Sequence, residues 1–133
     1  MRVFAAVAAV MAGVLLMVIP RFVFPACEYI GRGRMHCTAA AQGELVVGGL
    51  LVATGLAMFA LKSATGALVA SGCAVLLCAA AFLTPAYTRY CANPDMPCHY
   101  GMVPSIRFIA VALGLVESAA FIGLARRTLR GSA

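Results

Sequence analysis

The sequence predicts an all-α fold: an integral membrane four-helix bundle, built from two tandem helix–loop–helix halves that form a single transmembrane domain over residues 1–133. Of its 133 residues, 64% are hydrophobic and only 11% are charged, whereas an ordinary globular domain is about 45–50% apolar and about 25% charged. Four apolar stretches are also long enough to cross the hydrocarbon core of a bilayer, which takes about 20 helical residues. This composition excludes a soluble enzyme, a disordered tail and a free nucleic-acid-binding domain, so we expect the lipid bilayer to be the main partner.

The four stretches are apolar on every face and lack the alternation of β-strands, which favours helices. They cover residues 3–20, 45–61, 66–85 and 106–125. Residues 62–66 form a tight turn between the second and third spans, whereas residues 21–43 and 86–105 form two longer loops. Because an even number of crossings separates the two long loops, we expect both loops on one side of the membrane and both termini on the other.

The placement of cysteines, rather than basic charge, predicts the orientation. Lys and Arg are divided equally between the two sides, so the positive-inside rule does not decide it. Four of the six cysteines lie in the two long loops, and disulfides persist outside the cytoplasm. We therefore predict a multi-pass protein of the bacterial cytoplasmic (inner) membrane, with both termini in the cytoplasm and the two loops outside.

The two long loops carry a similar pattern, which is a cysteine, a short variable stretch and then Met-x-Cys. In the first loop Cys27 precedes the motif at 35–37, and in the second Cys91 precedes the motif at 96–98. Such a recurrence is typical of an internal repeat of one two-helix unit. It predicts that the two loops meet above a four-helix bundle.

The loop motifs also resemble a known family. The residues that carry the resemblance are Phe-Pro-Ala-Cys-Glu at 24–28, Met-His-Cys-Thr at 35–38, the Ala-rich run into Glu44 and Gly48, and Cys-Ala-Asn-Pro-Asp-Met-Pro-Cys at 91–98. They are similar to the small bacterial four-helix membrane proteins grouped as domain of unknown function 4418, and the resemblance covers most of the chain. It implies the four-helix membrane architecture, and it implies no established activity.

Structural disulfides are one interpretation of the loop cysteines. Pairing Cys27 with Cys37, and Cys91 with Cys98, would close two loops of roughly ten residues, each stabilised by about 2–4 kcal/mol. Pairing across the two loops is an alternative, because four cysteines allow three connectivities and the sequence does not choose among them. The two remaining cysteines, Cys73 and Cys78, lie within the third span and are expected to pack as small apolar side chains.

Two further interpretations give the loops a chemical role. Thioether, thiolate and imidazole groups select Cu(I) over hard cations, and a copper site that coexists with disulfides would use Met35, His36, Met96, His99 and Met102. Alternatively, the cysteines pass electrons to a quinone, as in four-helix thiol oxidoreductases. Reactive pairs are commonly spaced Cys-x-x-Cys, and neither loop has that spacing.

Inside the membrane, Glu117 is the carboxyl group expected nearest to the midplane, about 16 Å from Ile106 along the helix. An intramembrane carboxyl group is costly, which makes it a candidate functional residue. We expect it to be protonated or hydrogen-bonded inward, with Thr54 or Ser71 as its partner. Glu44 is placed at the outer end of the second span, where a carboxylate caps a helix favourably.

Close helix packing is a further expectation, because small residues four positions apart let helices approach each other. Three such pairs lie in the predicted spans: Ala9 with Gly13, Gly49 with Ala53, and Gly114 with Ser118.

Motifs for phosphate binding, zinc-protease chemistry, serine hydrolysis and dinucleotide binding do not occur in the sequence. We therefore predict a non-enzymatic accessory or interaction subunit without a cofactor, whose partner is another membrane or extracytoplasmic protein. Cu(I) handling is the first alternative, and quinone-linked thiol–disulfide exchange is the second.

Overall fold

The computed structural model describes residues 2–23, 36–61, 63–87, 95 and 98–131, and these residues contain no strand. Four helices are each long and apolar enough to cross a membrane, which confirms the all-α fold with four membrane-spanning helices. The elements are α1 (Arg2–Val18), the π-helical turn η1 (Ile19–Val23), α2 (His36–Ala60), α3 (Ala64–Tyr87), the π-helical turn η2 (Cys98–Met102) and α4 (Val103–Gly131).

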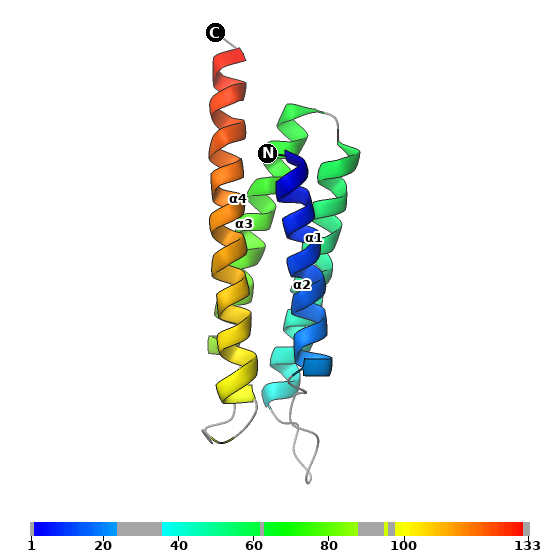
Figure 1. Cartoon of the computed structure of the whole chain (residues 1–133), viewed down its shortest axis with the longest axis vertical. Coiled ribbons are helices and arrows are strands. Elements are labelled where there is room, and N and C mark those ends of the chain that lie inside the picture. Colours follow the sequence, from blue (N-terminus) through cyan, green and yellow to red (C-terminus); the bar gives the residue numbers. More distant parts are fainter. Residues whose placement is uncertain (1, 24–35, 62, 88–94, 96–97, 132–133) are drawn as a thin grey trace.

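The four helices form an antiparallel bundle in which each helix packs against the next along the chain and α4 packs against α1 (Figure 1). The start of α1, the α2–α3 turn and the end of α4 lie at one end of the bundle, which we call the terminal end. At the opposite end, the loop end, α1 and α3 finish and α2 and α4 begin. Both ends of the chain therefore lie at the same end of the bundle.

Two helices differ from the predicted spans. Helix α2 begins at His36 rather than at 45, and α4 covers 103–131 rather than 106–125. The added segments contain polar residues, which is why hydropathy excludes them, but 36–44 has three alanines and 126–131 has three arginines, and both residue types favour helix strongly. Hydropathy marks the part of a helix that hydrocarbon surrounds, whereas helix propensity decides where the helix ends.

Prolines account for the irregular turns. Pro20 has no N–H group, so the regular hydrogen bond to the carbonyl four residues earlier is lost, and α1 widens there into η1. Pro85 lies in the last turn of α3 and is buried. Pro104 lies in the first turn of α4, directly after the π-helical turn η2.

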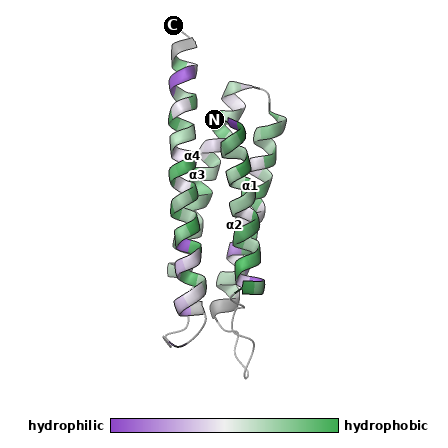
Figure 2. Ribbon diagram, in the orientation of Figure 1, coloured by the Kyte–Doolittle hydropathy of each residue, from purple (hydrophilic) through white to green (hydrophobic). Residues whose placement is uncertain are grey.

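Small side chains fill the interior of the bundle and large apolar side chains cover its surface. The core is mostly alanine, with a few large residues such as Leu16, Leu51 and Met58. Side chains such as Phe22, Phe108 and Leu115 are 77%, 75% and 69% exposed, and Figure 2 shows hydrophobic residues along all four helices. This arrangement suits lipid as the solvent, because helices in a bilayer associate by close packing rather than by hiding apolar surface from water.

The tightest contact joins α1 and α2 through glycines. A Cβ atom added at Gly48 would lie 2.7 Å from the Gly13 carbonyl oxygen, and one added at Gly13 would lie 2.6 Å from the Gly48 carbonyl oxygen. A Cβ added at Gly49 would meet nothing within 4 Å. The backbones of the two helices are therefore in contact at Gly13 and Gly48, while Gly49 lies off the interface.

The α2–α3 turn is closed by Ser63, which caps α3. The Ser63 hydroxyl oxygen accepts a hydrogen bond from the Gly66 N–H at 3.1 Å, and the Ser63 carbonyl accepts one from the Ala67 N–H at 3.1 Å. Serine at this position satisfies an N–H group that the helix itself leaves without an acceptor. The turn thereby fixes α3 antiparallel to α2.

We expect Gly48→Ala to destabilise the bundle and Gly49→Ala to leave it unchanged or slightly more stable. The methyl group at position 48 forces the two backbones apart, at a cost of about 1–3 kcal/mol, whereas at position 49 it has open space and a better helix propensity. Thermal unfolding in detergent micelles, followed by circular dichroism, measures both. Equal stability of the two variants would contradict the glycine contact.

Candidate functional site

Among the described residues, three polar side chains are fully buried in the bundle: Glu44, Ser71 and Glu117. They come from three different helices, α2, α3 and α4. Burying a polar group costs free energy unless it is hydrogen-bonded. These three residues are therefore the first candidates for function within the membrane.

Ser71 on α3 is the hydrogen-bond partner of Glu117 on α4. Its hydroxyl donates to Glu117 Oε2 at 3.1 Å and lies 3.2 Å from the Glu117 backbone carbonyl oxygen. The other carboxyl oxygen, Oε1, is buried and accepts no hydrogen bond. Glu117 lies fourteen residues after Val103, about 21 Å along a helix of about 43 Å, so this polar contact joins α3 and α4 near the middle of α4.

Thr54, the other partner considered for Glu117, does not reach it. The Thr54 hydroxyl lies 3.0 Å from the Leu50 carbonyl oxygen and 2.9 Å from the Leu51 carbonyl oxygen, both on its own helix. Threonine in a membrane helix commonly satisfies its hydroxyl group in this way. Of the two expected partners of Glu117, the structure shows Ser71 and not Thr54, because the Thr54 hydroxyl finds an acceptor within one turn of α2.

Glu44 does not cap a helix. Helix α2 begins eight residues earlier, at His36, so the carboxyl group lies two turns inside the helix and beyond the backbone N–H groups that a cap would satisfy. The Glu44 side chain is 0% exposed. The hydroxyl of Thr84 on α3 lies beside its carboxyl group and also donates to the Ala80 carbonyl at 2.8 Å. Glu44 is thus a buried carboxyl group that has the Thr84 hydroxyl as a polar neighbour.

Four of the nine candidate residues of the two loops lie outside the described residues, namely Cys27, Met35, Cys91 and Met96. The backbones of His36 and Cys37 begin α2, and those of Cys98 and His99 begin η2, so these four residues lie at the loop end of the bundle. The side chains of His36, Cys37 and Cys98 are not described, and the disulfide pairings stay a prediction. Met102 is fully buried in the helix core rather than part of a loop.

The two cysteines of α3 are free thiols on different faces of the helix. Cys78 is buried in the core, and Cys73 is exposed on the outer surface. No group of three or more His, Cys, Asp or Glu side chains that could hold a metal ion occurs within the described part of the chain.

Two features outside the core do not follow from the apolar pattern of the sequence. The guanidinium carbon of Arg107 on α4 lies 5.5 Å from the centroid of the Phe82 ring on α3. The basic segment that follows the fourth predicted span is helical, and α4 continues through exposed Arg126, Arg127 and Thr128 to Gly131. Helix propensity is the sequence signal that indicates this extension of α4, since Arg and Leu favour helix.

These features define a class: a multi-pass membrane protein whose closed four-helix bundle carries isolated polar groups in an alanine-rich interior. The family model described as a domain of unknown function, DUF4418, matches residues 9–123, so the chain belongs to this family. No curated protein and no solved structure matches the chain.

We expect a double-mutant cycle to detect coupling between positions 71 and 117 and none between positions 54 and 117. Ser71→Ala, Glu117→Leu and the double variant should give a coupling of about 0.6–1.7 kcal/mol, the range of hydrogen bonds between membrane helices. The matched cycle with Thr54→Val should be additive, because its hydroxyl bonds within α2. Unfolding in mixed micelles gives the free energies, and coupling at position 54 but not at position 71 would refute the assignment.

Proposed function

We propose that this chain is a non-enzymatic accessory subunit of a membrane complex, and that the projecting end of α4 binds its partner. The observation that carries the proposal is the length and position of that helix. Helix α4 extends past the other three helices at the terminal end (Figure 1). Its 29 residues span about 43 Å, compared with about 30 Å for the hydrocarbon core.

The projecting end is suited to a protein partner with an acidic surface. Arg126 and Arg127 are both exposed on it, and charge complementarity gives an interface its orientation and its association rate. The Thr128 hydroxyl donates to the Leu124 carbonyl oxygen at 3.0 Å, which adds a bond to the helix at this point. Because the rest of α4 packs against α3 and α1, the bundle holds the projecting end in place. Binding a partner therefore costs little conformational entropy.

The proposal includes the predicted orientation, in which the terminal end faces the cytoplasm. Its support is the four cysteines of the two long loops, since disulfides persist outside the cytoplasm; the basic end of α4 is compatible with the cytoplasmic side. Reporter domains fused after Ser132 and inserted near Gly33 separate the two sides. An active extracytoplasmic reporter after Ser132 would reverse the orientation.

Soft-metal binding at the loop end is the second candidate function. The observation that favours it is that α2 and η2 begin at the same end of the bundle, with His36, Cys37, Cys98 and His99 as their first residues. Thioether, thiolate and imidazole groups suit Cu(I). Mass spectrometry of the purified protein for copper and for disulfides distinguishes this role from a purely structural one. A copper-free protein with two loop disulfides, and with Cys73 and Cys78 as its two free thiols, excludes it.

Site-specific photo-crosslinking in intact cells tests the accessory role. A photoreactive residue at Thr128 should give one discrete protein adduct, because this position lies on the projecting end. The matched control is Ile122, which is half exposed on the lipid-facing surface of the same helix and should give no protein adduct.

Charge reversal then separates a protein partner from lipid headgroups. Arg126→Glu together with Arg127→Glu should remove the adduct without lowering the amount of protein in the membrane, because both side chains are exposed. If Thr128 crosslinks only to lipid, or if Ile122 gives the same adduct, the projecting end is not a docking element.

A further inference from the structure

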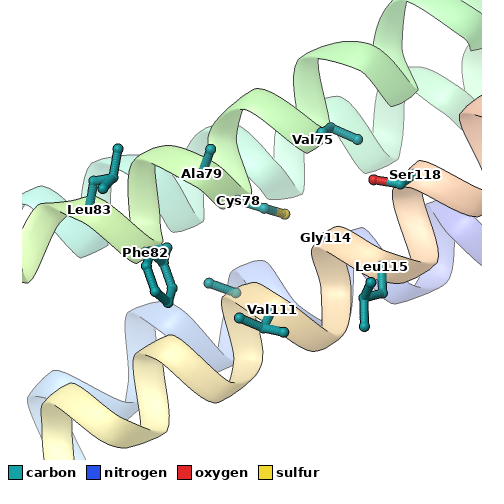
Figure 3. Close-up of a pocket in the computed structure, with 10 residues that line it drawn as sticks. Val75, Cys78, Ala79, Phe82, Leu83, Val111, Gly114, Leu115 and Ser118 are labelled. Atoms are coloured by element: carbon teal, nitrogen blue, oxygen red, sulfur yellow. The ribbon is translucent and has the colours of Figure 1, made fainter.

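An open groove runs along the outer surface of the bundle between α3 and α4 (Figure 3). Its volume is about 410 Å³, and its walls are mainly apolar side chains such as Phe82, Val111 and Leu115. Figure 3 shows Phe82 and Cys78 pointing from α3 toward α4, with Gly114 opposite Cys78. A side chain at position 114 would occupy this space, so the glycine keeps the groove open.

Arg107 lies at the loop end of this groove. It shares one face of α4 with Val111, Gly114 and Ser118, because residues at i, i+4, i+7 and i+11 align along a helix. Its guanidinium group lies over the ring of Phe82, which is itself part of the groove wall. The Arg107 Nε atom is buried, and no described residue accepts a hydrogen bond from it. A cationic group whose Nε has no acceptor among the described residues therefore lies beside an apolar groove.

The position of Arg107 along α4 favours an anion beside it. It lies four residues after Val103, about 6 Å from the start of the helix, where a bilayer places its headgroups around a span of this length. Space for an anion exists in a hollow of about 390 Å³ lined by His99, Val103, Pro104 and Arg107.

The groove below Arg107 has the length of one lipid tail. From Arg107 to Ser118 the helix rises eleven residues, or about 16 Å. Half of a hydrocarbon core of about 30 Å is about 15 Å, which is the depth that the acyl chains of one leaflet cover.

We propose that the groove between α3 and α4 holds an acyl chain of an acidic phospholipid, and that the Arg107 guanidinium donates hydrogen bonds to its phosphate group. Guanidinium groups bind phosphate oxygens through two parallel hydrogen bonds, and basic pockets between membrane helices bind anionic headgroups. The proposal is independent of the partner at the end of α4, because it uses the opposite end of the helix.

Native mass spectrometry of the detergent-purified protein tests the proposal, with phosphatidylglycerol and phosphatidylcholine of identical acyl chains as probes. The wild-type protein should retain one phosphatidylglycerol more tightly than phosphatidylcholine. Arg107→Gln should weaken phosphatidylglycerol binding about fivefold, the effect of one arginine near a membrane surface. Arg21→Gln is the matched control, because Arg21 is an exposed arginine at the same end of the bundle, and it should leave binding unchanged.

Variants that fill the groove test the proposal in a second way, by the same lipid-binding measurement. Gly114→Leu should reduce retention of both lipids, whereas Gly49→Leu, on an open part of α2, should not. Gly114→Ala is the milder variant, because its Cβ would lie an ordinary 3.6 Å from the Cys78 Cβ. Equal loss in Arg107→Gln and Arg21→Gln, equal retention of the two lipids, or a quinone or a protein recovered in place of phospholipid would each overturn the proposal.

Discussion

Close approach of α1 and α2 is the constraint on which the rest of the structure depends. Lipid gives helices no hydrophobic reason to associate, so a membrane bundle is held by packing, interhelical hydrogen bonds and the lipid it releases. In this protein the helices pack closely because most of the interior side chains are small. The Gly13 and Gly48 backbones touch, alanines fill most of the core, and the large apolar side chains point outward. This closely packed bundle positions the groove, the buried carboxyl groups and the projecting end of α4.

An interior made of small apolar residues offers buried polar groups few hydrogen-bond partners. The two buried glutamates differ in the partners that they find. Glu117 receives one hydrogen bond from Ser71, which ties α4 to α3. Glu44 is fully buried on α2 beside the Thr84 hydroxyl of α3, which also donates to the Ala80 carbonyl of its own helix. Glu44 lies on the part of α2 nearest the loop end.

The sequence predicts the helices well because the signal is physical and strong: long apolar runs must be helical in a bilayer, where every backbone group needs an internal partner. It does not predict which small residues meet. Gly49 and Ala53 have suitable spacing, but Gly48 makes the contact, since the rotation of a uniformly apolar helix is set only by packing. The choice of Ser71 over Thr54 for Glu117 depends on the same rotation. The position of Glu44 could not be predicted because α2 begins nine residues before its apolar run.

The central claim is therefore that each helix turns one face to lipid and packs the other face into an interior made mostly of alanine. The chain contains no tryptophan, so a single introduced tryptophan reports its own surroundings without background. The most direct measurement is the quenching of its fluorescence by phospholipids with brominated acyl chains, comparing Leu115→Trp with Leu113→Trp in the same vesicles. Leu115 is 69% exposed and Leu113 is 5% exposed, so the account predicts strong quenching at position 115 and weak quenching at position 113. Equal quenching at the two positions would contradict it.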